Sequence, residues 1–187
     1  MKGVDKPSMP PASIIMKIDS ILKKYFDKYR ELNVLPPIIA GQANGKLPKE
    51  MPHTLYYQEN ETLMVVGKPD DYFELADGSI VPFDHKTRSS PPVSTHSAHQ
   101  LQMDVYSYLL EKNGYKTTEI AYLAYYYPSD CDVHDGLSMD CKVVEVKTSI
   151  ERAKTLIKKA IQVIEGEAPE PNKECKYCNW AKGIMNE

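Results

Sequence analysis

Two aspartates and a lysine lie close together in the segment GKPDDYFELADGSIVPFDHKTRS, residues 67–89. Asp84 and Lys86 are two residues apart near the end of a predicted strand, so both side chains point to the same face. Asp70 lies within the preceding predicted strand, about 4.8 Å away if the register aligns the two. His85 points to the opposite face and leaves its backbone carbonyl near Asp84. Two carboxylates and a carbonyl suit Mg²⁺ or Mn²⁺, and Lys86 could position or deprotonate an attacking water.

The same charges also have a purely structural interpretation. Asp84 and Lys86 would then form an ion pair on an exposed strand edge, and Asp70 and Asp71 would be turn residues. However, charges at the end of a buried strand are costly unless something pairs with them. The apolar run SIVPF before D-x-K, and G-x-P-D on the adjacent strand, favour the metal site. In that interpretation Asp71 is a neighbour of the site rather than a ligand.

Alternating helix and strand patterns surround these residues. The segment 13–32 repeats apolar residues at helical spacing, and the Asp-Gly pair at 77–78 is a hairpin signal. The predicted elements, in chain order, are helix 13–32, strands 54–60, 63–75 and 79–87, helix 97–115, strands 119–128 and 142–148, and helix 149–167. We expect the first three strands to form an antiparallel meander. The order of elements predicts an α/β core, a mixed sheet flanked by helices.

The motifs GKPD, VPFDHKT and, on the next predicted helix, QMDVY together resemble the PD-(D/E)XK nuclease superfamily. Its RecB-type and CRISPR-associated exonuclease branch is the most similar, over about residues 50–128. This resemblance implies a restriction-endonuclease-like core and Mg²⁺- or Mn²⁺-dependent hydrolysis of DNA phosphodiester bonds. It implies these roles: metal ligands Asp70, Asp84 and the His85 backbone carbonyl, catalytic lysine Lys86, and supporting or substrate-contacting helix residues Gln102 and Tyr106.

The helix pair has an ordinary alternative. Gln102 and Tyr106 are four residues apart and share a helix face, so Tyr106 could instead be a core-edge aromatic residue and Gln102 a solvated one. Arg88 is a candidate phosphate contact, because a guanidinium binds phosphate oxygens bidentately. His96 and His99, at the start of the same helix, are expected to be exposed, with contact to nucleic acid as the alternative.

The resembling branch often carries a further histidine or acid upstream of the first aspartate. His53, Asp27 and Glu31 are the available residues. His53 is kept as a candidate substrate-binding residue, although a structural or exposed histidine is the simpler interpretation. The basic run at Lys17, Lys23, Lys24, Lys28 and Arg30 is interpreted as solvated helix surface, with a binding face as the alternative.

Cys175 and Cys178 have C-x-x-C spacing, which is half of a four-ligand zinc or iron–sulfur site. Many relatives in the resembling branch hold an iron–sulfur cluster with one upstream cysteine and three near the C-terminus, whereas this tail has two. Cys131 and Cys141 could complete the set, or could lie at the two ends of an acidic loop. One hypothesis is a cluster or zinc site that is complete only in a longer form of the protein.

Composition sets the remaining expectations. A chain of 187 residues fits one nuclease-like domain over 1–187, with a core at 54–166 and an irregular tail at 167–187. A net charge of −3 and a pI near 6.0 do not indicate a nucleic-acid binder, so any basic surface must be local. With no apolar run of roughly 18 residues and no secretory leader, we expect a cytoplasmic protein without membrane contact.

The leading hypothesis is therefore a metal-dependent nuclease that acts on single- or double-stranded DNA. The alternatives are a non-catalytic nucleic-acid-binding or assembly module on the same fold, and a structural domain built around a metal cluster. The residues leave open exonuclease or endonuclease action, strand polarity, DNA or RNA as substrate, and protein partners.

Overall fold

The computed structural model describes residues 13–61, 63–167, 170, 174, 175, 177 and 178. The chain divides into two compact units, residues 1–153 and 154–187, and each is described by itself. The single-domain expectation remains a prediction. None of the described helices is both long enough and apolar enough to span a membrane.

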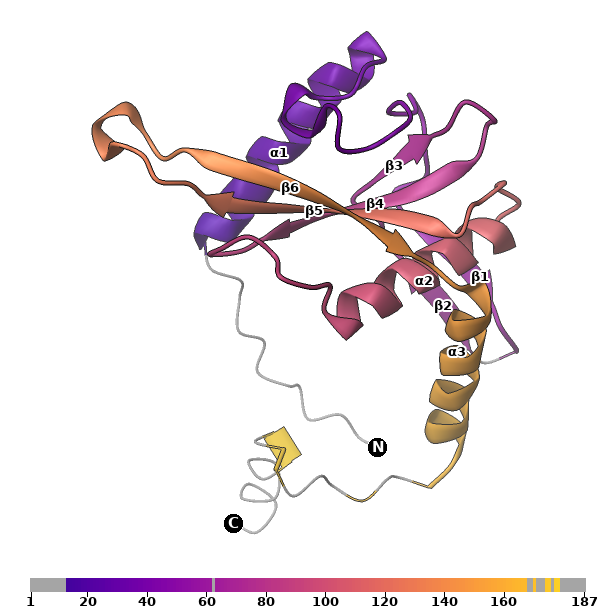
Figure 1. The fold of residues 1–187 in the computed structure, drawn as a ribbon. Helices are drawn as coiled ribbons and strands as arrows, with labels where there is room; N and C mark the ends of the chain where they lie inside the picture. Colours follow the sequence, from indigo (N-terminus) through magenta and orange to yellow (C-terminus); the bar gives the residue numbers. More distant parts are fainter. Residues whose placement is uncertain (1–12, 62, 168–169, 171–173, 176, 179–187) are drawn as a thin grey trace. The chain divides into compact units, whose positions relative to one another are not determined.

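The first unit is an α/β fold built on a four-stranded mixed sheet (Figure 1). The elements are α1 Ser13–Leu32, η1 Pro37–Ile39, β1 Leu55–Gln58, β2 Met64–Gly67, β3 Asp71–Glu74, β4 Ile80–Thr87, α2 Ser97–Lys112, β5 Ile120–Pro128, η2 Val133–Asp135, β6 Met139–Lys147 and α3 Ile150–Glu165. The strand order is β3-β4-β5-β6, in which β4 and β5 are parallel and the other two pairs are antiparallel. The predicted α/β core with a mixed sheet and flanking helices is confirmed.

Helix α1 covers one face of the sheet, and its bounds match the predicted helix. Leu22 and Phe26 are its buried residues, and Phe26 packs against Phe83 of β4 with ring centroids 5.5 Å apart. Ile14 and Ile21, two of the apolar residues that repeat at helical spacing, are more than half exposed. The C-terminal half of the helix therefore packs on the sheet, and it lies close to the β3–β4 hairpin.

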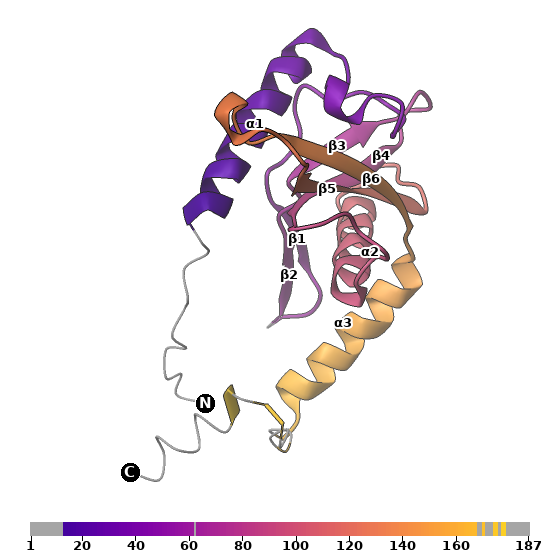
Figure 2. The same ribbon diagram turned by 60° about the vertical axis from the view of Figure 1, so that its left-hand side comes forward.

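Helix α2 covers the opposite face, as the two views in Figures 1 and 2 show. It forms the crossover connection between β4 and β5, because two parallel strands cannot be joined by a tight turn. Met103 and Tyr106 pack against Leu123 and Tyr125 of β5 in a core separate from the one beneath α1. Because helices cover both faces, β5 is an apolar interior strand, as its sequence predicted.

The predicted three-stranded meander is wrong. The segment expected as one strand, 63–75, is two strands, β2 and β3, separated at Lys68, Pro69 and Asp70. Strand β2 pairs only with β1 in a two-stranded sheet, whereas β3 pairs with β4 in the main sheet. The physical reason is Pro69, which lacks the N–H that a continuous ladder needs and restricts the residue before it.

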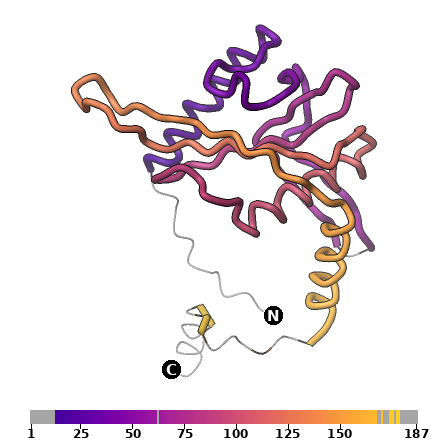
Figure 3. Tube along the Cα trace, in the orientation of Figure 1, coloured from indigo at the N-terminus to yellow at the C-terminus, as the bar shows by residue number. Residues whose placement is uncertain are grey.

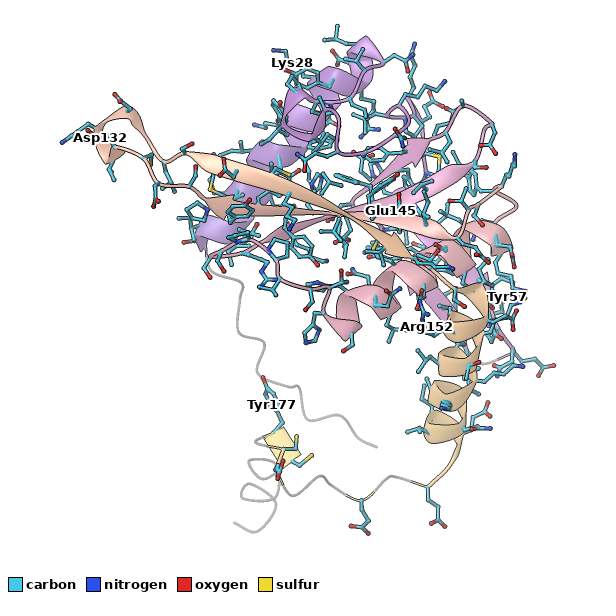
Figure 4. All side chains as sticks on the ribbon, viewed as in Figure 1. Lys28, Tyr57, Asp132, Glu145, Arg152 and Tyr177 are labelled. Atoms are coloured by element: carbon cyan, nitrogen blue, oxygen red, sulfur yellow. The ribbon has the colours of Figure 1, made fainter. Side chains whose placement is uncertain are left out.

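The start of α3 is tied to α2 by a buried carboxylate. Asp104 is fully buried and accepts hydrogen bonds from the Arg152 guanidinium at 2.5 and 2.7 Å and from the Ser149 backbone N–H at 2.9 Å. The Ser149 hydroxyl accepts from the Arg152 N–H, so Ser149 caps α3. Figure 4 shows Arg152 beside α2 at this point.

Strands β5 and β6 continue past the other strands of the sheet as a hairpin arm (Figure 3). Its end is the acidic loop around η2, where Asp132 is labelled in Figure 4. Cys131 lies in this loop, with its thiol 3.4 Å from the Gly136 carbonyl. The second unit contains the rest of α3 and the C-x-x-C segment, while most of the tail predicted at 167–187 lies outside the described residues.

Candidate active site

Asp84 and Lys86 lie on the face of β4 that α2 covers. Asp84 is buried, and its carboxylate forms an ion pair with the Lys86 ammonium. The ammonium also donates a hydrogen bond of 2.9 Å to the side-chain oxygen of Gln102 on α2. Two-residue spacing on a strand therefore places the acid and the lysine side by side, and Gln102 of α2 holds the lysine by a hydrogen bond.

Gln102 and Tyr106 extend this network away from the sheet. The Gln102 amide nitrogen lies 2.8 Å from the Tyr106 hydroxyl and 3.5 Å from Asp84 Oδ1. The Tyr106 hydroxyl donates at 3.0 Å to the backbone carbonyl of Lys68, in the break between β2 and β3. Gln102 is therefore hydrogen-bonded within the protein and not merely solvated, whereas Tyr106 does belong to the core between α2 and β5, as the alternative expected. Burial, followed by the charge of Asp84, raises the pKa of Tyr106 to about 12, so the hydroxyl keeps its proton.

Asp70 faces Asp84 across the start of the β3–β4 hairpin, although it does not lie in a strand as expected. The pairing of Asp71 with Phe83 means that one step further along the register Asp70 lies opposite Asp84. The Asp70 carboxylate accepts the His85 backbone N–H at 3.0 Å. The break at Pro69 thus leaves Asp70 at the sheet edge, exposed and next to the buried acid.

The electrostatics of Asp84 fit a cation site. Burial, and then the nearby charge of Asp70, raise the pKa of Asp84 to about 6 despite the opposing effect of Lys86. Among the described residues, no donor makes a hydrogen bond of ordinary geometry to Asp84 Oδ2, which faces the Lys86 ammonium. A divalent cation shared by Asp70 and Asp84 would offset this mutual repulsion, and oxygen ligands are those that Mg²⁺ and Mn²⁺ prefer.

The His85 side chain points to the other face of β4, as predicted. Its ring packs against Phe26 and Phe83 with centroids 4.6 and 4.9 Å away, and its Nδ1 lies 3.0 Å from the Tyr126 hydroxyl. Burial lowers the pKa of His85 to about 4, so the ring is neutral near pH 7. His85 therefore contributes its backbone, and not its ring, to the Asp70–Asp84 side of the sheet.

Asp71 forms an ion pair with Arg30 of α1 and does not face the site. Its buried carboxylate accepts a hydrogen bond of 2.6 Å from Arg30, which also donates at 2.8 Å to the Pro48 carbonyl. Burial raises the pKa of Asp71 in spite of Arg30. The two consecutive aspartates therefore have different surroundings, with Asp71 anchoring α1 and Asp70 facing Asp84.

Gly67, the first residue of the G-x-x-D motif, lies against α2. A Cβ added at this position would lie 2.5 Å from Leu109 Cδ1 and 3.2 Å from Tyr106 Cδ1, and Leu109 is fully buried. We expect Gly67→Ala to lower the free energy of unfolding by about 1–3 kcal/mol, because overpacking must displace one of these side chains. The measurement is urea unfolding.

A matched control for Gly67→Ala is Val66→Ala. Val66 is the preceding residue of β2, and its side chain is 46% exposed. Its truncation should cost less than about 1 kcal/mol. Equal stability of wild-type protein and Gly67→Ala would show that the close approach of β2 to α2 is not required.

A cleft of about 520 Å³ opens beside Asp70 on the α1 side of the sheet. His53 and Asp27 line it, so two of the three upstream residues lie near Asp70, whereas Glu31 is not among its lining residues. The cleft also includes Lys49, which the sequence analysis did not single out. No periodicity marks Lys49, because it lies in the irregular segment before β1.

Arg88 and two histidines lie near Lys86, after the end of β4. The Arg88 guanidinium lies 5.6 Å from the ring centroid of Tyr125, whose hydroxyl is 3.2 Å from His99 Nδ1. His96 is exposed as expected and caps α2 by accepting the Ala98 N–H. His99 is only partly exposed, contrary to expectation. Burial and then the charge of Lys86 lower the pKa of His99.

The described residues show no metal site formed by the four cysteines. Within that part of the chain, no group of three or more histidine, cysteine or carboxylate side chains could hold a metal ion. Cys141 lies on β6, and burial raises the pKa of its thiol to about 11. In the second unit, the Cys178 backbone N–H lies 3.4 Å from Cys175 Sγ. Ligand roles for Cys175 and Cys178 remain predictions.

The chain is similar to a known protein family. A family model described as the PD-(D/E)XK nuclease superfamily matches residues 18–182. No curated protein matches the chain. Among solved structures, the crystal structure of SSO0001 is similar at 19% identity with a TM-score of 0.47, over 91% of this chain and 72% of that chain.

Proposed function

Because the chain belongs to the PD-(D/E)XK nuclease superfamily, we propose that it is a metal-dependent nuclease that hydrolyses DNA phosphodiester bonds at the Asp70–Asp84–Lys86 site. The observation that carries this proposal is the buried Asp84 carboxylate paired with Lys86, opposite Asp70. An acid that is buried and repelled by a second acid destabilises a fold, and acids of this kind are concentrated at functional sites.

Asp70, Asp84 and the His85 carbonyl would hold Mg²⁺ or Mn²⁺. Such a cation, when bound, lowers the pKa of a water ligand and withdraws charge from a phosphate oxygen. Lys86, held by Gln102, would orient the attacking water, take part in moving its proton and stabilise charge that develops on the phosphate. A new bond forms from the water oxygen to phosphorus, the bond to one sugar oxygen breaks, and that oxygen leaves with a proton.

Gln102 and Tyr106 would act as positioning residues. Tyr106 is anchored to the Lys68 carbonyl, and it holds the Gln102 amide so that its oxygen remains directed at Lys86. The lysine is therefore restrained before substrate arrives, which is the preorganisation that electrostatic catalysis needs. Arg88, exposed beyond the strand, is proposed to contact a phosphate of the substrate, and His53 is proposed to contact substrate in the cleft.

The test is a cleavage assay on end-labelled single- and double-stranded DNA with the full chain. We expect shortened products with Mn²⁺ or Mg²⁺ and none in excess EDTA, because EDTA removes the cation that Asp70 and Asp84 would hold. The positions of the products would also distinguish exonuclease from endonuclease action. Intact substrates in every metal-containing reaction, together with DNA binding, would instead support a non-catalytic binding module.

A further inference from the structure

The cleft beside Asp70 contains cationic side chains that the proposed catalytic site does not use. Lys23 and Arg30 come from α1, and Lys49 comes from the segment before β1. They lie along the same cleft as Asp70, which would hold the cation. The run of basic residues in α1 is therefore divided: Lys23 and Arg30 line the cleft, whereas Lys24 and Lys28 do not. Figure 4 shows Lys28 on α1.

Arg30 is already engaged in holding the fold together. It binds Asp71 at 2.6 Å, donates to the Pro48 carbonyl at 2.8 Å and lies 3.5 Å from Asp27. Its side chain is 21% exposed, so these contacts leave little of the guanidinium for a ligand. Arg30 carries one positive charge, so it offsets only part of the combined charge of Asp71 and Asp27, two of the acids that line the cleft.

The ammonium groups of Lys23 and Lys49 can bind a ligand more readily than the Arg30 guanidinium can. Lys23 is paired at 2.9 Å with Asp19, one helical turn away, and both side chains are about half exposed. Exposed pairs of this kind contribute little stability, so a phosphate can replace Asp19. The hydrogen bond to Asp19 is the main cause of the raised pKa of Lys23. Lys49 is exposed and has no ion pair with any described residue.

We propose that this cleft binds one strand of the nucleic acid next to the scissile phosphate, with Lys23 and Lys49 contacting its backbone phosphates. The inference rests on the proposed function. A volume of about 520 Å³ lies in the range of sites that enclose a small ligand, so the cleft accommodates a single strand rather than a duplex. Acidic side chains also line the cleft, namely Asp27, Glu50, Asp70 and Asp71. Their charge opposes binding; Arg30 offsets part of it, and the two lysines must outweigh the rest.

The experiment measures binding without cleavage. A fluorescein-labelled single-stranded oligonucleotide is titrated with the full chain in EDTA, by anisotropy, over a series of KCl concentrations. Lys23→Ala and Lys49→Ala should each weaken binding and reduce the slope of log K against log salt by about 0.7, as expected for the loss of one phosphate contact on a single strand. Lys24→Ala is the control, because Lys24 is the exposed neighbour of Lys23 outside the cleft.

Two further arms strengthen the design. Asp19→Asn should tighten binding by roughly two- to fivefold, because it removes the carboxylate that competes for Lys23. An unlabelled blunt duplex should compete at least about tenfold less well than an unlabelled single strand. Equal effects of Lys23→Ala and Lys24→Ala, or equal competition by the duplex, would overturn the inference even if the wild-type protein cleaves DNA. Binding that depends on Lys23 and Lys49 in a protein without nuclease activity would refute the proposed function and leave the cleft site standing.

Discussion

Lys86→Ala is expected to lower the rate of DNA cleavage with Mn²⁺ by at least about a hundred- to a thousandfold, the loss that follows removal of one preorganised electrostatic contact. The ammonium of Lys86 is held between the Asp84 carboxylate and the Gln102 amide oxygen, so it cannot be replaced by a neighbouring cation without rearrangement. The measurement is single-turnover cleavage of end-labelled DNA under saturating enzyme.

The control for this variant is Lys116→Ala. Lys116 forms an ion pair with Asp77 in which both side chains are more than half exposed, so its removal should leave cleavage unchanged. Lys86→Ala should keep its thermal stabilisation by Mn²⁺, because Asp70 and Asp84 remain. Wild-type cleavage rates in Lys86→Ala would contradict the proposed mechanism, and loss of the Mn²⁺ effect would show that the lysine is required for the metal site itself.

The local geometry of the candidate site could be predicted because it depends on short sequence spacings. Asp84 and Lys86 share a face because strands have a period of two, and Gln102 and Tyr106 share a face because they are one helical turn apart. Both relations hold in the structure, where one network joins these four residues. Their catalytic roles remain a proposal, since spacing places side chains but does not show what they do.

Asp70 was expected within a strand, but the structure has no strand at that residue. A continuous strand was expected through Pro69, but the chain breaks there and β2 joins a different sheet. Asp70 nevertheless lies opposite Asp84, because β3 begins at the next residue and its register with β4 is set by buried Tyr72 and Phe73. The sequence left this register open, and the single proline determined where pairing stops.

The cleft could not be predicted, because its walls come from segments that are distant in sequence. Lys23 and Lys49 are brought together only when α1 packs on the sheet through Phe26 and is tied by Arg30 to Asp71. A helical pattern shows which residues of α1 are apolar, yet it does not show which of its lysines will face a neighbouring loop. The different surroundings of Lys23 and Lys24 depend on this tertiary contact.

Asp84→Asn should abolish cleavage and, in the absence of metal, change how stability depends on pH. Asp84 has a pKa of about 6 in the folded protein, against 3.8 ordinarily, so between these values the folded state binds more protons than the unfolded chain. Stability therefore falls as pH rises through this window, and stays lower above it. The asparagine variant carries no such charge. From about pH 4.5 to 7.5 in EDTA, the wild-type protein should lose about 2 kcal/mol of unfolding free energy that the variant keeps.

Urea unfolding of both proteins at the two pH values measures this difference, and Asp77→Asn supplies the control. Asp77 is exposed, and the hydrogen bond from Lys116 is the largest of the effects that lower its pKa to about 2, so it stays ionised across the whole range and its variant should show the wild-type slope. Mn²⁺ should then stabilise the wild-type protein at pH 7.5 and leave Asp84→Asn unaffected, because the cation relieves the repulsion between Asp70 and Asp84 that the substitution removes. Parallel pH slopes for wild-type protein and Asp84→Asn would show that the buried acid is not held against its ionisation, and the electrostatic basis for a cation between the two aspartates would be lost.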